Sequence, residues 1–181
     1  MPKLICLDTR IAPIFAICLC SCSDSAKPIA LANSFEAPTL GEAFALTIIG
    51  NTLSFCANSG GHEVNLQTGK VLPRNETCPA KLEANTACSG LPADPSVRST
   101  PNQPDEIIDF NGRSYPLQGR VQDCVSNGSR LAIATNATVL WLDSSESGTH
   151  IVQQSGADRI AISGTWIAWT SGNRLLAKAI H

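Results

Sequence analysis

The feature that most constrains the fold is a pattern of apolar residues that recurs around three glycines, Gly50, Gly128 and Gly164. Apolar side chains occupy most positions four and two residues before each glycine, and three and five residues after it. The alternation has a period of two on both sides. Each copy therefore predicts two strands with one buried face, joined by a tight turn at the glycine. The residues at these offsets are Leu46, Ile48, Leu53 and Phe55, then Cys124, Ser126, Leu131 and Ile133, then Ile160, Ile162, Ile167 and Trp169.

A third strand is predicted after each pair, at residues 63–66, 139–143 and 174–180. The turns before these strands are rich in Asn, Ser and Gly, which tolerate positive φ. Gly128 and Gly164 are 36 residues apart, whereas Gly50 and Gly128 are 78 residues apart. This spacing leaves room for one more unit between the first two copies.

The segment between the first two copies contains a strong hairpin signal. Residues 106–110 and 113–117 have strand character and flank Asn111-Gly112, a dipeptide typical of two-residue hairpin turns. A loop rich in Pro, Ser and Asn precedes them at residues 90–104. The middle unit is either a diverged repeat or a hairpin with a long insertion.

Repeats of about 40 residues with several short strands are typical of propeller blades. Residues 159–169, with the sequence RIAISGTWIAW, resemble the blade repeats of bacterial envelope and cell-surface β-propellers. The resemblance implies an all-β fold, a small or incomplete β-propeller-like repeat domain that spans residues 42–181. A β-sandwich with the same alternation is the alternative.

The first residues have the composition of an export signal. Lys3 and Arg10 precede an apolar run at residues 11–20, and this run is too short for a membrane span of about 20 residues. We therefore predict a cleaved signal at residues 1–21. Residues 22–41 are rich in Ala, Ser and Pro without periodicity and are predicted to form a tether.

The end of the apolar run resembles the lipobox of bacterial prolipoproteins, with Leu19, Ser21 and Cys22 at the matching positions. Cys20 departs from the small or β-branched residue that is commoner there. The resemblance implies that Cys22 receives fatty acyl groups such as palmitate and becomes the new N-terminus. Ser23 then favours the outer membrane, with the domain facing the periplasm or the cell surface. The alternative is ordinary cleavage after residues 30–32.

Removal of the signal leaves 11 basic and 14 acidic side chains, a net charge of −3. The sequence contains no basic cluster that would attract nucleic acid. The predicted partners are therefore the membrane, through lipid on Cys22, and another envelope protein, with no nucleic acid.

Four cysteines remain after the signal and Cys22 are set aside, namely Cys56, Cys78, Cys88 and Cys124. An even number in an oxidising compartment predicts two disulfides, for which three connectivities exist. The short loop between Cys78 and Cys88 favours that pair, which leaves Cys56 for Cys124. No close Cys-x-x-Cys pair supports a zinc site, and we predict neither a metal nor another cofactor.

Residues for catalysis are scarce in the sequence. No Gly-x-Ser-x-Gly elbow, His-Glu-x-x-His or phosphate-binding glycine loop occurs, so an enzyme is the less favoured class. His62 lies in a predicted turn beside Glu63 and is a candidate surface contact or base. The acidic group Asp105, Glu106 and Asp109 lacks the ligand spacing of a calcium loop.

Two of the three tryptophans have different predicted roles. Trp169 occupies a core-facing offset in the third copy. Trp166 follows Gly164 in the predicted turn and is the second candidate surface contact.

The predicted function is that of a lipid-anchored binding or scaffolding module, which presents its loops to another envelope protein. A periplasmic hydrolase or lyase is the first alternative, and it requires His62 to meet Glu63, Asp105 or Asp123 in one pocket. A lipoprotein that neutralises a periplasmic toxin is the second alternative, in line with the small size and the acidity of the chain.

Overall fold

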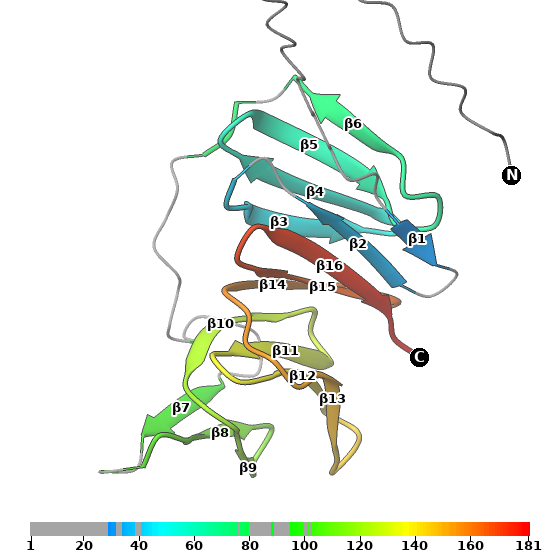
Figure 1. The fold of residues 1–181 in the computed structure, drawn as a ribbon. Helices are drawn as coiled ribbons and strands as arrows, with labels where there is room; N and C mark the ends of the chain where they lie inside the picture. Colours follow the sequence, from blue (N-terminus) through cyan, green and yellow to red (C-terminus); the bar gives the residue numbers. More distant parts are fainter. Residues whose placement is uncertain are drawn as a thin grey trace, which may run out of the picture.

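A computed structural model describes residues 29–31, 34–38, 41–75, 77–79, 88, 95–99, 101 and 103–181. The described residues form sixteen strands in four antiparallel sheets (Figure 1). No helix among them is long and apolar enough to cross a membrane. The predicted signal at residues 1–21 and the predicted lipidation of Cys22 lie outside the described residues.

We number the sheets in chain order. The first sheet contains β3 (Phe44–Ile49), β4 (Thr52–Ala57), β5 (Gly60–Asn65) and β6 (Val71–Arg74). The second sheet contains β7 (Ser96–Ser99), β8 (Glu106–Phe110) and β9 (Arg113–Pro116). The third sheet contains β10 (Val121–Ser126), β11 (Arg130–Thr135), β12 (Val139–Asp143) and β13 (Thr149–Gln153). The fourth sheet contains β14 (Arg159–Ile162), β15 (Trp166–Ser171) and β16 (Arg174–Ala179), together with β1 (Ile29–Leu31) and β2 (Ser34–Pro38).

The predicted repeat around three glycines is confirmed in the first, third and fourth sheets. The second strand of each copy begins two residues after its glycine, at Thr52, Arg130 and Trp166. Gly50 and Gly128 have φ values of +58° and +101°, which explains why glycine occupies these turns. The predicted third strands correspond to β5, β12 and β16.

The middle unit is a diverged repeat with three strands. Its predicted hairpin is present as β8 and β9, joined by Asn111 and Gly112 with φ values of +51° and +74°. Positive φ at both turn residues is the geometry of a type I′ turn, which matches the twist of the flanking strands. Among the described residues, the second sheet has three strands, whereas the first and third sheets have four.

The fourth sheet takes its outer strands from the start of the described chain. β2 pairs with β16 in antiparallel register, with Glu36 opposite Leu176. Phe35 and Ala37 are buried, whereas Glu36 is exposed and forms an ion pair with Arg174. β1 and β2 fall within residues 22–41, so part of the range assigned to a tether belongs to a sheet.

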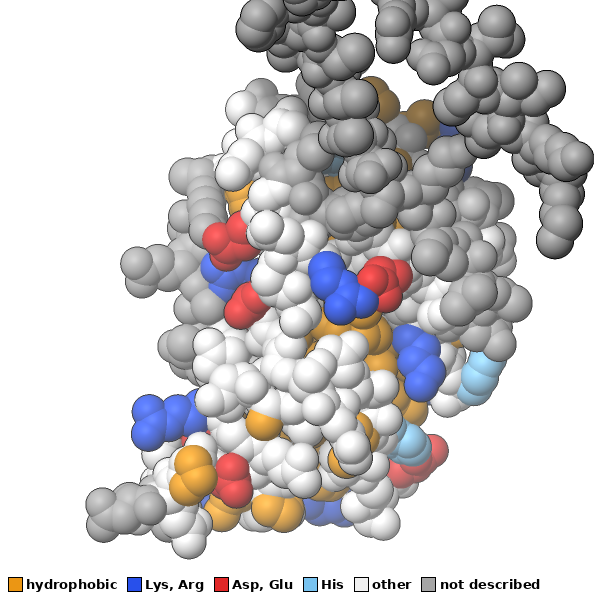
Figure 2. All heavy atoms as spheres, viewed as in Figure 1, with side chains coloured by type: hydrophobic (Ala, Val, Ile, Leu, Met, Phe, Trp, Pro, Cys, Tyr) orange, Lys and Arg blue, Asp and Glu red, His pale blue; other side chains and the backbone are white. Residues whose placement is uncertain are grey.

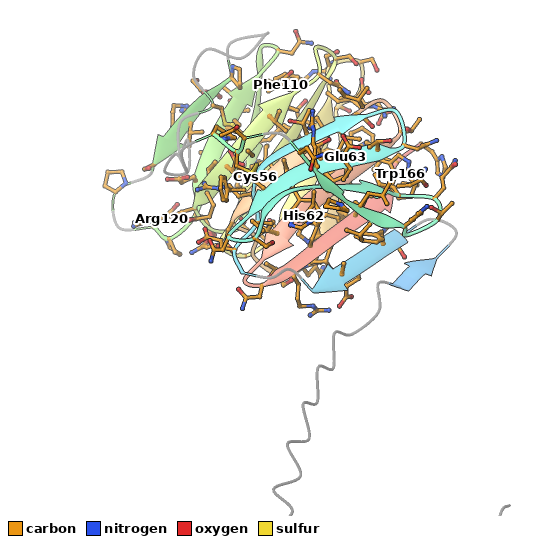
Figure 3. The ribbon with its side chains drawn as sticks, turned by 90° about the horizontal axis from the view of Figure 1, so that it is seen from above. Cys56, His62, Glu63, Phe110, Arg120 and Trp166 are labelled. Atoms are coloured by element: carbon orange, nitrogen blue, oxygen red, sulfur yellow. A yellow bond between two sulfur atoms is a disulfide. The ribbon has the colours of Figure 1, made fainter. Side chains whose placement is uncertain are left out.

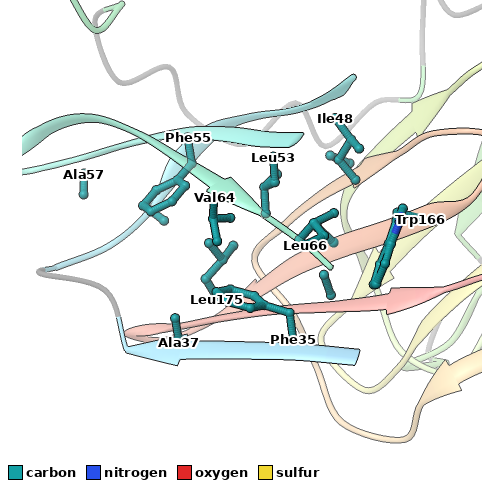
Figure 4. Packing of buried hydrophobic residues seen from close by; sticks show 14 residues of the cluster. Phe35, Ala37, Ile48, Leu53, Phe55, Ala57, Val64, Leu66, Trp166 and Leu175 are labelled. Atoms are coloured by element: carbon teal, nitrogen blue, oxygen red, sulfur yellow. The ribbon is translucent and has the colours of Figure 1, made fainter. Parts of the chain in front are cut away.

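The four sheets stack in the order first, fourth, third and second (Figure 1). One buried cluster joins the first and fourth sheets (Figure 4), a second joins the fourth and third, and a third joins the third and second. The inner strand β14 contacts both β3 and β10. Four stacked antiparallel sheets make a small, incomplete β-propeller-like domain rather than a two-layer sandwich.

The disulfides connect Cys56 with Cys78 and Cys88 with Cys124. The prediction of two disulfides is confirmed, but the predicted pairing of Cys78 with Cys88 is wrong. Cys56 lies in the first sheet and Cys124 in the third, and the fourth sheet lies between them, so these two cannot form the other bond. The length of the loop between two cysteines does not show which sheets carry them, and so it could not predict this pairing.

Asp123 links the third sheet to the fourth, because its Oδ2 accepts a hydrogen bond from the backbone N–H of Ile160 at 3.0 Å. Partial burial raises the pKa of Asp123, and the bond from Ile160 and the charge of Arg159 oppose that change. The carboxylate is therefore a hydrogen-bond acceptor that is costly to ionise in the folded state.

We expect Asp123→Asn to preserve stability and Asp123→Ala to lower the free energy of unfolding by about 1–3 kcal/mol, because alanine leaves the Ile160 N–H without an acceptor. A raised folded-state pKa gives a stabilising contribution below the unfolded pKa that is lost as pH rises through the folded pKa. The wild type should therefore lose stability relative to Asp123→Asn as pH rises above the ordinary carboxyl range. Urea unfolding at several pH values measures both effects, and equal pH dependence of the two proteins contradicts the prediction.

Candidate binding site on the first sheet

The first sheet lies at one end of the stack and has two different faces. Successive side chains of a strand point to opposite faces. Leu53, Phe55 and Val64 face the fourth sheet and are buried in the shared cluster (Figure 4). Ser54 and Glu63, which are paired across β4 and β5, lie on the other face. We call this the outer face of the first sheet.

A pocket of about 200 Å³ opens on the outer face. Its floor includes Cys56 and Gly61, which are directly opposite in the register of β4 and β5. Gly61 lines the pocket with its backbone, because it has no side chain beyond hydrogen. Figure 3 labels Cys56 and Glu63 on the strands of this sheet. The pocket is lined by Ala45, Thr47, Ser54, Phe55, Cys56, Gly61, Arg74, Thr77 and Pro79.

The Cys56–Cys78 disulfide fixes one wall of the pocket. Its Cα atoms are 5.8 Å apart, so the bond holds the segment after β6 against β4. Thr77 and Pro79 flank Cys78 and both line the pocket. The disulfide thus positions part of the site as well as cross-linking the chain.

The pocket contains hydrogen-bond donors and acceptors that could bind a small polar part of a ligand. Arg74 Nε lies 3.4 Å from Glu63 Oε1, and both side chains are more than a third exposed. Such an exposed pair contributes only about 0–1 kcal/mol to stability. The pair matters because it holds the guanidinium of Arg74 beside the pocket, and a guanidinium carries five N–H donors in a fixed plane. The hydroxyls of Thr47 and Ser54 add groups that both donate and accept.

Exposed aliphatic side chains flank this polar pocket. Leu72 is opposite Glu63 in β5 and β6, and 47% of its surface is exposed. Ile49 is two residues after Thr47 on β3 and is 76% exposed. The outer face therefore combines a polar pocket with apolar contact area, a composition common in protein interfaces.

The charged residues on the face in Figure 2 do not gather by sign. Among the described residues there, basic and acidic side chains lie beside one another. On this face, the distribution fits the low net charge of the chain.

The catalytic group required by the hydrolase alternative is not assembled. His62 lies in β5 rather than in a turn, stacks on Phe55 at 5.3 Å, and has its Nε2 atom 2.8 Å from Ser59 Oγ. Glu63 lies on the face of the first sheet opposite to that of His62. Asp123 lies on β10 of the third sheet and accepts a hydrogen bond from Ile160 on β14 of the fourth sheet. His62 is partly exposed and does not line the pocket.

Trp166 is buried, and the prediction that it makes a surface contact is wrong. It is 4% exposed, packs between the first and fourth sheets, and donates its indole N–H to Asn51 Oδ1 at 3.0 Å. The turn ends one residue earlier than predicted, so Trp166 is the first residue of β15. The core position of Trp169 is confirmed, because it too is 4% exposed.

The acidic residues near β8 bind protein donors instead of forming one site. Asp105 accepts from the Gly119 N–H at 2.8 Å, and Glu106 accepts from the Val121 N–H at 2.8 Å. A hydrogen bond from Arg98 lowers the pKa of Asp109 to about 2. Within the described part of the chain, no group of three or more His, Cys, Asp or Glu side chains could hold a metal ion.

A stacked group in the third sheet was not predicted. The ring of His150 stacks on Trp141 at 3.9 Å, and the guanidinium of Arg130 lies 4.7 Å from the Trp141 ring. Arg130 also donates to the Gly164 carbonyl at 2.9 Å, which joins the third and fourth sheets. Only the cross-strand register, with Trp141 opposite His150, could have indicated this contact.

No protein-family model matches the chain, and no curated protein matches its sequence. Several solved structures are similar at low identity. They include the computationally designed Ika8 protein, with 9% identity over 84% of this chain and 57% of that chain and a TM-score of 0.33. BamB from Moraxella catarrhalis has 12% identity over 84% of this chain and 58% of its own, with a TM-score of 0.31. Saccharomyces cerevisiae Sqt1 has 12% identity over 83% and 53%, with a TM-score of 0.30. The chain thus spans somewhat more than half the length of these structures.

Proposed function

We propose that this chain is a lipid-anchored envelope protein that binds another envelope protein through the outer face of its first sheet. The observation that carries the proposal is the polar pocket beside Arg74, flanked by the exposed side chain of Leu72. Complete burial of an aliphatic side chain of this size contributes about 1.5–3 kcal/mol. The exposed part of Leu72 can therefore contribute to affinity once a partner covers it.

The pocket sets the chemistry of the partner. A carboxylate or amide side chain that enters it meets donors on Arg74 and on the hydroxyl-bearing residues Thr47 and Ser54. An apolar side chain beside that group would cover Leu72. We therefore expect a partner segment in which an acidic or amide residue lies next to an apolar one.

The anchor determines where this face operates. Ile29, the first residue of β1, is seven positions after Cys22. A fully extended chain spans at most about 3.6 Å per residue, so lipid on Cys22 would hold the edge of the fourth sheet within about 25 Å of the bilayer. A partner that is itself attached to the outer membrane lies within that reach, on its periplasmic or external side.

The proposal is tested by a photo-cross-linking amino acid placed at Leu72 in the full chain, expressed in bacteria. We expect a discrete cross-linked product at this position and none at Thr165, an exposed turn residue in the fourth sheet. Ser54→Phe, which fills the pocket, should remove the product without lowering the melting temperature. Cys22→Ala should also remove it if the anchor brings the two proteins together.

Equal labelling at Leu72 and Thr165, or a product that survives Ser54→Phe, would overturn the proposed face. The identity of the captured protein separates the remaining alternatives. A membrane-associated envelope protein fits a scaffold, whereas a basic enzyme fits the toxin-neutralising lipoprotein.

A further inference from the structure

The outer edges of the sheets differ in how they are protected against pairing with another strand. β6 contains Pro73 and β9 contains Pro116, and both strands lie at the edge of their sheets. Proline removes a backbone donor and is a common feature of protected edges. β13 is also an edge strand, but its sequence, Thr-His-Ile-Val-Gln, contains no proline, lysine, arginine or carboxylate. Its register shifts by one residue between Ile151 and Gln153, which leaves the stretch from Thr149 to Ile151 in regular pairing with β12.

We propose that β13 pairs in antiparallel register with β13 of a second copy of this chain, about a two-fold axis beside His150. This pairing joins two third sheets into one continuous sheet of eight strands. It does not use the outer face of the first sheet, so it stands or fails independently of the function proposed above.

The hydrogen-bond pattern of the third sheet shows which groups of β13 point outward. The Thr135 N–H donates to the Thr138 carbonyl at 2.8 Å, so Thr135 and Thr138 form a hydrogen-bonded pair. Hydrogen-bonded and non-hydrogen-bonded pairs then alternate along β11 and β12. Leu140 and Leu142 then direct their backbone groups to β11, and Trp141 directs its groups to β13. His150, opposite Trp141, therefore bonds within the sheet.

The residues on either side of His150 have the opposite orientation. Thr149 is opposite Leu142 and Ile151 is opposite Leu140, so both direct their N–H and C=O groups away from β12. A two-fold axis at His150 places Thr149 of one copy opposite Ile151 of the other. Each of these two pairs exchanges two backbone hydrogen bonds, and all the outward groups of Thr149 and Ile151 obtain partners.

The side chains fit the same arrangement. Thr149 and Ile151 lie on one face of β13, both are exposed, and Ile151 is 49% exposed. Cross-strand pairs of β-branched residues are favourable, and here each threonine covers the exposed isoleucine of the other copy. The strand carries no charged side chain apart from His150 when protonated, so no carboxylate or ammonium on one β13 faces its equivalent on the other.

His150 does not obstruct the axis. Its ring is stacked on Trp141, and its Nε2 atom lies 2.6 Å from Glu146 Oε2. Both contacts hold the ring against its own sheet. A second copy is favoured over an unrelated peptide because its own β13 supplies what this edge needs: exposed Thr149 and Ile151 at the mutually opposite positions, and no carboxylate or ammonium in the strand.

The test uses His150→Cys in the full chain, purified from whole cells under oxidising conditions. Residues opposite each other in a non-hydrogen-bonded antiparallel pair have Cα atoms about 4.5 Å apart, within the range of a disulfide. We expect a covalent dimer on a non-reducing gel. Gln154→Cys is the matched control, because the two copies of this exposed residue lie far from the axis and should remain monomeric.

Two further changes in the His150→Cys background decide the outcome. Ile151→Pro removes an outward N–H, and Ile151→Lys places a charge at the edge, so each should reduce the dimer at least tenfold while Ile151→Val retains it. Melting temperatures show that the variants are folded. A folded His150→Cys protein that stays monomeric overturns the proposal, and so does dimerisation that is equal at Gln154→Cys or insensitive to Ile151→Lys.

Discussion

Reduction of both disulfides should lower the free energy of unfolding by about 6–8 kcal/mol. The bonds close loops with sequence separations of 22 and 36 residues. On the chain-entropy model, loops of this length restrict the unfolded chain by about 3–4 kcal/mol each. Since the total stability of a domain is about 5–15 kcal/mol, the reduced protein should be close to its unfolding midpoint at room temperature. Urea unfolding with and without a reductant measures the difference.

Separate removal of each bond tests the contributions of the two loops. The double variant Cys88→Ala and Cys124→Ala should cost more than Cys56→Ala and Cys78→Ala. Cys88 and Cys124 are both buried in the cluster between the second and third sheets, and the bond between them closes the longer loop. The latter pair should instead disturb the pocket, since it releases the segment that holds Thr77 and Pro79. An unchanged midpoint on complete reduction of both bonds, verified by thiol titration, contradicts the expected stabilisation.

The repeat could be predicted from sequence because its signals are local. Alternation around each glycine depends on residues within one hairpin, and the starts of β4, β11 and β15 agree with it. The strand β2 was missed for the opposite reason. Phe35 and Ala37 alternate with Glu36 over only a few residues, and their partner strand, β16, is more than a hundred residues away in the sequence.

The candidate site depends on contacts that a sequence does not contain. Neither Gly61 nor Cys56 indicates a pocket by itself; only the register shows that they are opposite each other and can both line one. The wall near Thr77 requires the Cys56–Cys78 bond, which loop length had assigned to another pair. Trp166 was misplaced because a one-residue shift in a turn moves a side chain from the surface to the core.

Phe35→Ala should lower the free energy of unfolding by about 3–5 kcal/mol, the usual cost of removing a buried aromatic ring. Phe35 is 2% exposed and belongs to the cluster between the first and fourth sheets (Figure 4). It lies on β2, which reaches this cluster from the start of the described chain. The loss should therefore weaken the attachment of β2 as well as the core. Urea unfolding gives the change, and hydrogen exchange should show faster opening along β16.

Glu36→Ala provides the control on the same strand. Glu36 is exposed and pairs with Arg174, so its removal should cost less than about 1 kcal/mol. A large difference between the two variants means that β2 is held by its buried face, because both changes leave the backbone pairing with β16 intact. Equal costs would contradict that, and would indicate that the Glu36–Arg174 ion pair matters as much as the core contact. β2, which follows β1 on the side of the predicted anchor, is then a structural part of the domain, since Phe35 fills the interface between the fourth and first sheets while its strand pairs with β16.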